Sequence, residues 1–118
     1  MSIFATMKRY IETNRNRFFE ELFSLLRIPS VSAKAEHKPD MYFCAQRLCE
    51  LLLEAGADSA DIYETAGNPI VFGQKIIDPS LRTVLVYGHY DVQPPNESYL
   101  LSQLFRGMES IDQFYDYW

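Results

Sequence analysis

The sequence predicts an α/β fold in which two helices pack on a small mixed sheet. Three observations lead to this expectation. Residues 5–27 and residues 39–55 of the 118-residue chain each repeat apolar side chains at helical spacing. Residues 83–87 then form an unbroken apolar run that is typical of a strand covered on both faces. The order of two helices followed by strands indicates a layered α/β or α+β arrangement.

The first predicted helix covers residues 5–27. Ile11, Phe18, Leu22 and Leu25 recur along one face and give the helix an apolar stripe. Pro29 ends the helix, because the residue before a proline is pushed out of the helical region. The charged residues between positions 12 and 21 are expected to form the solvated face, and residues 28–32 to form an extended connector.

The second predicted helix runs from about Pro39 to Ala55. Pro39 suits the first turn, where its missing N–H leaves no hydrogen bond unmade. Gly56 suits the left-handed residue that closes a helix. Two short strands are expected at residues 61–65 and 69–74, separated by a turn at residues 66–68. Residues 83–87 would then be the central strand of three.

Composition excludes several classes of protein. The net charge of −5 argues against nucleic acid or an anionic membrane as partner. No apolar run approaches the roughly 18 residues that cross a bilayer, and the charged first helix does not resemble a secretory signal. A cytoplasmic protein is therefore expected. The two cysteines, Cys44 and Cys49, are five positions apart on a helix and do not converge on one metal, so they are expected to be plain thiols in the core or at the surface.

The candidate for chemistry is the pair His89 and Asp91, which directly follows the predicted central strand. Ligands of open α/β sheets bind beyond the carboxyl ends of strands. A neutral imidazole is a good metal ligand and needs an acceptor that fixes its tautomer. Asp91 lies two residues on, hence on the same side of an extended backbone. On residue pattern alone a His-x-Asp pair is more often structural than metal-binding. The other histidine, His37, is expected to be a solvated loop residue.

Residues 88–94, with the sequence GHYDVQP, resemble the first metal motif of the co-catalytic zinc peptidases, a family that includes aminoacylases, carnosinase-like dipeptidases and succinyl-diaminopimelate desuccinylases. The resemblance extends upstream through residues 17–32, 55–56, 64–69 and 83–87 in the same order. The ending Val92-Gln93-Pro94 is most similar to the dipeptidase branch. The resemblance implies that the chain is a partial catalytic domain of a zinc peptidase.

The resemblance also implies roles for two residues. His89 would bind one zinc ion, and Asp91 would be the catalytic-site residue that orients it. The family uses two zinc ions to activate water for attack on a peptide or amide carbonyl. The implied substrates of the parent enzyme are dipeptides or N-acyl amino acids.

Residues 95–118 do not match the family's sequence beyond this motif. No bridging aspartate, glutamate base or further ligand is recognisable there. We therefore divide the chain into residues 1–94, the N-terminal part of the catalytic domain, and residues 95–118, an unmatched aromatic tail. The expectation is a fragment that binds zinc weakly or not at all and is inactive alone. The alternative is a non-catalytic interaction module that docks through short amphipathic helices in the tail. Oligomeric state stays open.

Overall fold

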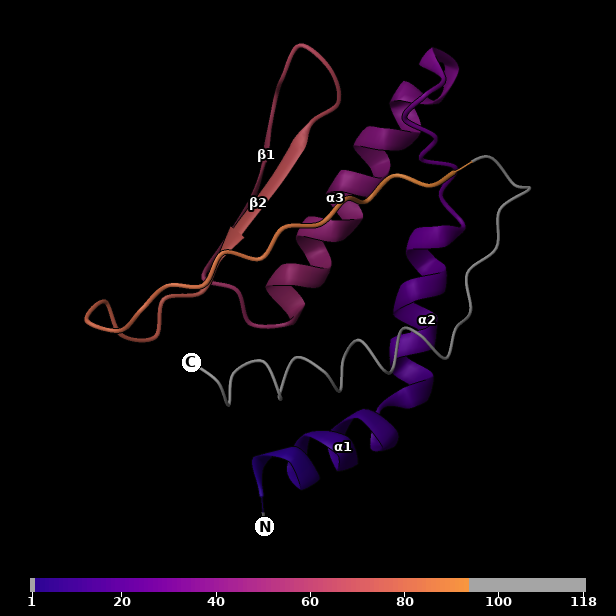
Figure 1. Cartoon of the computed structure of the whole chain (residues 1–118). Coiled ribbons are helices and arrows are strands. Elements are labelled where there is room, and N and C mark those ends of the chain that lie inside the picture. The colour runs from indigo at the N-terminus through magenta and orange to yellow at the C-terminus, as the bar shows by residue number, and fades with distance from the viewer. Residues whose placement is uncertain (1, 94–118) are drawn as a thin grey trace. The chain divides into compact units, whose positions relative to one another are not determined.

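A computed structural model of the chain describes residues 2–93 (Figure 1). These residues belong to two compact units, which divide after Glu20. The expected helices of the aromatic tail, and the tail itself, lie outside the described residues. None of the helices between residues 2 and 93 is long and apolar enough to cross a membrane.

The first unit contains α1 (Ile3–Thr13) and the beginning of α2 (Arg15–Leu26). The prediction of one helix over residues 5–27 is wrong at Asn14, which leaves the helical region with φ −101° and ψ 12°. The Asn14 side chain donates to the carbonyl oxygen of Tyr10 at 2.8 Å. Asparagine favours such local hydrogen bonds over helix continuation, which accounts for the break.

The second unit is built on α3 (Lys38–Glu54), which follows a short 3-10 turn at Ala35–His37. Pro39 lies in the first turn of α3, as predicted. Gly56 has φ +100° and lies just past the helix end, which confirms its predicted role. The amide of Ala57 reaches back to the carbonyl of Leu52 at 3.0 Å, the bond that usually closes such helix ends.

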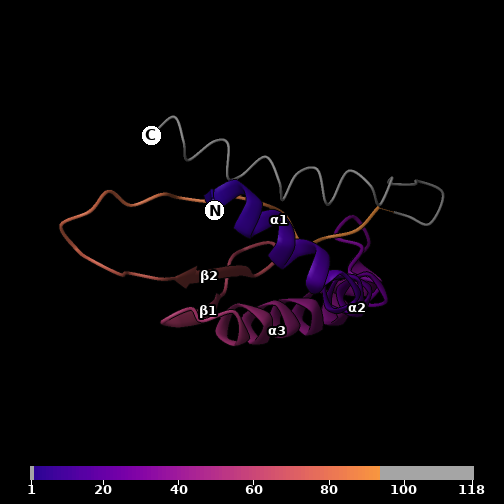
Figure 2. The same cartoon turned by 90° about the horizontal axis from the view of Figure 1, so that it is seen from below.

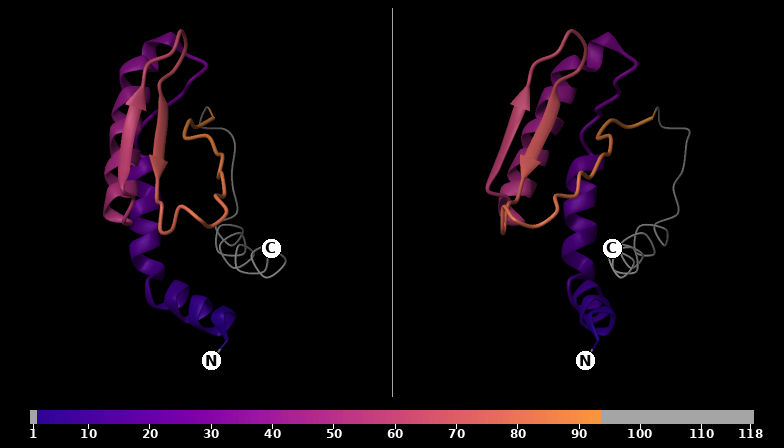
Figure 3. Two further views of the ribbon diagram at one scale, coloured as in Figure 1. Left: turned by 90° about the vertical axis from the view of Figure 1, so that its left-hand side faces the viewer. Right: turned by 60° about the vertical axis from the view of Figure 1, so that its left-hand side comes forward.

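Two antiparallel strands follow, β1 (Ser59–Tyr63) and β2 (Ile70–Gln74). Both lie along α3, and the helix and the hairpin form two layers (Figure 2, Figure 3). Ala60, Ile62, Val71 and Gly73 alternate with more exposed residues, and this alternation places them on the helix side. The two strands expected at residues 61–65 and 69–74 are therefore confirmed, although β1 begins and ends two residues earlier than predicted.

The predicted third strand is wrong. Residues 84–87 have no regular secondary structure, and their side chains are exposed, with Tyr87 90% exposed. The sheet in the described residues consists of β1 and β2, and residues 84–87 pair with neither strand. An apolar run forms a buried strand only where other elements cover both of its faces. The α/β class with helices on a small sheet is confirmed, but the sheet is antiparallel rather than mixed.

The core of the second unit lies between the connector after α2 and one face of α3. Its buried apolar side chains are Ile28, Val31, Met41, Cys44 and Ala45. Met41 and Ala45 are four positions apart on α3, so the helical spacing of apolar side chains predicted for residues 39–55 is confirmed at these two residues. Burial raises the pKa of the Cys44 thiol, and Cys44 and Cys49 are both free. The prediction of plain thiols is confirmed.

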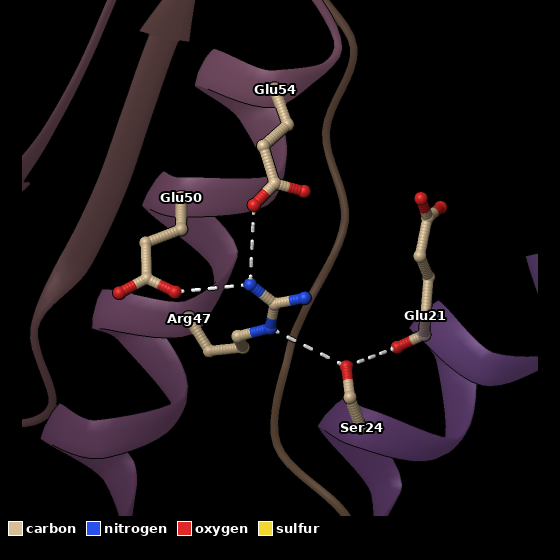
Figure 4. A network of polar contacts seen from close by, with 5 residues as sticks. All are labelled: Glu21, Ser24, Arg47, Glu50 and Glu54. Carbon is tan, nitrogen blue, oxygen red and sulfur yellow. Dashed lines mark hydrogen bonds and ion pairs between the residues drawn. The ribbon is translucent and has the colours of Figure 1, made fainter. Parts of the chain in front are cut away.

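A polar network joins α3 to the end of α2 (Figure 4). The Arg47 guanidinium contacts Glu50 at 3.0 Å and Glu54 at 3.5 Å, and its Nε donates to the Ser24 hydroxyl at 3.5 Å. Ser24 in turn donates to the backbone carbonyl of Glu21 at 2.6 Å. These bonds hold α3 beside the helix end from which the Ile28–Ser32 connector leaves.

Candidate metal-binding site at His89 and Asp91

The connector after α2 and the segment at residues 89–92 lie against each other. The Val92 amide donates to the carbonyl oxygen of Ser30 at 3.0 Å, and the Ser30 hydroxyl donates to the carbonyl of Tyr90 at 3.4 Å. Ser30 is fully buried. Both bonds join positions about sixty residues apart in sequence, so they fix the path of the chain through the candidate site.

His89 and Asp91 meet as the sequence predicts. Nδ1 of His89 lies 2.7 Å from Oδ1 of Asp91. The His89 side chain is 78% exposed, whereas that of Asp91 is 33% exposed. The bond to Asp91 occupies Nδ1 and leaves Nε2 facing away from that carboxylate. The exposed nitrogen is thus available to a ligand.

The second oxygen of Asp91 is also engaged. The Ser32 hydroxyl donates to Oδ2 at 2.5 Å. This hydrogen bond lowers the pKa of Asp91 most, and the bond with His89 lowers it further, while partial burial acts in the opposite direction. Asp91 is therefore held as an ionised carboxylate, with Oδ1 on His89 and Oδ2 on Ser32.

Tyr90 points to the other side of this segment. Its hydroxyl donates to the carbonyl oxygen of Pro69, directly before β2, at 2.5 Å. The Cys44 thiol lies 3.7 Å from the Tyr90 carbonyl oxygen. Burial is the main cause that raises the pKa of Tyr90. Tyr90 thus anchors the segment to the hairpin and to α3, while the residues on either side of it face the opposite way.

No pattern in the sequence pointed to Ser30, Ser32 or Tyr90 as supports of the pair. Ser30 and Ser32 belong to the predicted connector, and a serine 59 positions from its partner leaves no local pattern. The expectation for His37 needs correction. Its Nδ1 lies 2.8 Å from Asp40 Oδ2 at the start of α3, and its side chain is only 26% exposed. The imidazole is within hydrogen-bonding distance of this carboxylate, so His37 is a partnered residue rather than a solvated one.

The described residues do not fit a complete metal site. Between residues 2 and 93, no three histidine, cysteine, aspartate or glutamate side chains come together as a ligand group. Catalytic zinc sites generally use three protein ligands. His89 can supply one of them, with Asp91 behind it, and any others must come from elsewhere.

Comparison with solved structures places this fold among the dipeptidases. The structure of the dipeptidase Dug1p from Saccharomyces cerevisiae matches with a TM-score of 0.70 and 28% identity, over 78% of this chain and 22% of that one. No protein-family model matches the chain.

Comparison with curated sequences finds relatives of a more specific kind, the Cys-Gly metallodipeptidases. The chain is 35% identical over 96 residues to the Cys-Gly metallodipeptidase DUG1 of Candida albicans, and 36% identical over 93 residues to that of Schizosaccharomyces pombe. Each match covers 71% of this chain and 20% of the relative. The chain thus spans about a fifth of the length of these relatives. Over the matched part the chain is similar to these metallodipeptidases, and the name of the relatives implies that they use a metal cofactor.

Proposed function

We propose that residues 1–94 are the N-terminal part of a zinc-dependent dipeptidase catalytic domain, and that residues 95–118 are a tail outside that domain. His89 is proposed as a zinc ligand and Asp91 as the catalytic-site carboxylate that orients it. The observation that carries the proposal is the His89–Asp91 contact of 2.7 Å with the imidazole exposed, in a chain whose relatives are metallodipeptidases.

The proposed substrate of the parent enzyme is a dipeptide, by analogy with the Cys-Gly specificity in the names of the relatives. This chain is proposed to be inactive alone. One imidazole holds zinc only weakly against competing water and buffer, and no glutamate in residues 2–93 joins His89 and Asp91 as a general base. The interaction module that uses residues 95–118 is not favoured, because the matched proteins are dipeptidases.

The test is a calorimetric zinc titration of the whole chain, run beside a Cys-Gly hydrolysis assay. We expect weak zinc binding that His89→Ala abolishes, and no hydrolysis. His37→Ala is the matched control, because His37 also has its Nδ1 on an aspartate yet is not proposed as a ligand. Zinc binding that survives His89→Ala would contradict the ligand role of His89. Tight stoichiometric binding, or turnover that depends on His89, would show that the site is complete.

A further inference from the structure

We propose that Ser32 is a positioning residue, which holds the Asp91 carboxylate in the one orientation that presents Nε2 of His89 outward as a ligand atom. The inference rests on the proposed function in one respect, that His89 is a metal ligand. The geometry itself stands on two contacts, Ser32 Oγ to Asp91 Oδ2 at 2.5 Å and Asp91 Oδ1 to His89 Nδ1 at 2.7 Å.

A carboxylate at the end of a short side chain rotates easily, because its terminal torsion has a broad energy minimum. Asp91 is also one-third exposed, so water could compete for either oxygen. A donor on Oδ2 fixes the carboxylate plane and thereby the direction in which Oδ1 meets the imidazole. Ser32 is therefore needed for orientation and not only for packing.

Ser32 is itself well placed to act as a fixed support. It is half-buried, and it follows Val31, which is buried in the core. Two residues before Ser32, Ser30 makes the two bonds that tie the connector to residues 90 and 92. Ser32 and Asp91 thus belong to two backbone segments that the hydrogen bonds of Ser30 hold together.

The consequence for His89 is a choice of tautomer. A carboxylate on Nδ1 favours the neutral imidazole that carries its proton there, and this leaves the lone pair on Nε2 for a metal. If Asp91 loses the hydrogen bond from Ser32 and turns towards water, it no longer holds the proton of His89 on Nδ1. The imidazole then returns towards the mixture of Nδ1-protonated and Nε2-protonated forms that a free histidine has. The effect is measurable without any metal.

The experiment records two-bond proton–nitrogen correlation spectra of the whole ¹⁵N-labelled chain, free of metal, at one fixed pH near about 8.5, where a histidine of ordinary pKa of about 6.5 is neutral. The chain has two histidines, so His37 is an internal reference. We expect His89 to be mainly protonated on Nδ1 in the wild type. Ser32→Ala should reduce that population at least twofold, and Ser32→Thr, which keeps the hydroxyl, should restore it.

Ser80→Ala is the matched control, because Ser80 also donates to an aspartate, Asp78 Oδ1 at 2.7 Å. Ser80→Ala should leave the tautomer populations of both histidines unchanged. If Ser32→Ala does not fold, Ser32→Cys serves, since a thiol of similar shape is a weaker donor and should give a smaller loss of the Nδ1-protonated form. A folded Ser32 variant with unchanged His89 nitrogens would overturn the proposal.

A zinc titration of the same samples separates this proposal from the function. If Ser32→Ala changes the His89 tautomer while the wild type binds no zinc, Ser32 positions the imidazole as proposed and the proposed function fails. If zinc binding depends on His89 but Ser32→Ala leaves the tautomer unchanged, the function stands and the role of Ser32 is wrong.

Discussion

Tyr90 joins three parts of the second unit at a single residue. Its hydroxyl donates to the Pro69 carbonyl, and its own carbonyl oxygen accepts from Ser30 and lies 3.7 Å from the Cys44 thiol. Tyr90 is half-exposed, and Pro69 is buried. Tyr90, which lies between the proposed zinc ligand His89 and the carboxylate that orients it, thus contributes much of the anchoring of the candidate site.

We expect Tyr90→Phe to destabilise the chain by about 1–3 kcal/mol, because it leaves the carbonyl of the buried Pro69 without its hydrogen bond from the Tyr90 hydroxyl. The measurement is urea unfolding followed by far-UV circular dichroism. Tyr87→Phe is the matched control, since Tyr87 is 90% exposed and should change the free energy of unfolding by less than about 0.5 kcal/mol. Equal effects of the two substitutions would contradict the anchoring role of Tyr90.

For individual residues, the sequence predicted the contact between residues that are close along the chain. It missed the contacts between residues that only folding brings together. His89 and Asp91 are two residues apart, so an extended backbone was sufficient to bring them together. Ser32 and Pro69 reach the segment from 59 and 21 positions away. No local periodicity encodes such partners, because they result from the packing of the connector and the hairpin on α3.

The contact between α3 and the hairpin depends on a close approach at Gly73. A Cβ atom at this position would lie 3.1 Å from Leu52 Cδ1 and 3.3 Å from the Ser59 carbonyl oxygen. Gly73 pairs with Ala60 in β1, so two small residues face the helix side by side. The absence of a side chain at Gly73 lets the strand lie close to Leu52.

Gly73→Ala should therefore lower the free energy of unfolding by about 1–3 kcal/mol, through strain between β2 and its neighbours. Gly67→Ala is the matched control, because a Cβ there would meet nothing closer than the Thr65 hydroxyl at 3.9 Å. That substitution should be neutral or slightly stabilising, since it restricts the unfolded chain. Thermal unfolding of both variants gives the comparison, and a neutral Gly73→Ala would show that the helix and hairpin can separate without loss.

The elements that the sequence predicted well are those with local end signals. Pro39 and Gly56 bracket α3 by the stereochemistry of their own backbones, so its limits were predictable within one residue. Asn14 is a weaker signal, because asparagine occurs within helices as well as between them. The prediction of a central strand at residues 84–87 rested on hydrophobicity alone, and this signal cannot show which strand would pair with them.

Among residues 2–93, the segment after β2 exposes a run of large apolar side chains. Its most exposed side chains are Ile77, Leu81, Leu85, Val86 and Tyr87. An extended apolar segment without a strand partner among the described residues offers free backbone N–H and C=O groups for association. We therefore expect a marginally stable, aggregation-prone chain.

We expect Leu85→Lys to keep the chain monomeric at higher concentrations than the wild type, with an unchanged thermal midpoint, because the Leu85 side chain is 83% exposed and a charge there would disrupt no buried contact. Light scattering across a concentration series is the measurement. Gln46→Lys, at an exposed position of α3, adds the same charge elsewhere and should not help to the same degree. If both variants improve solubility equally, net charge and not the exposed segment governs association.

The hydrogen bonds between residues 30–32 and 90–92 have a consequence for the order of folding. They close a loop of about sixty residues, whereas the contacts of α3 with β1 and β2 join parts of the chain that follow one another. Closing a long loop is entropically unfavourable until the elements within it are ordered. The ribosome has also synthesised α3 and the hairpin before it reaches His89. We therefore expect the histidine segment to dock last in the folding of this unit, so that the candidate site forms only after α3 and the hairpin are in place.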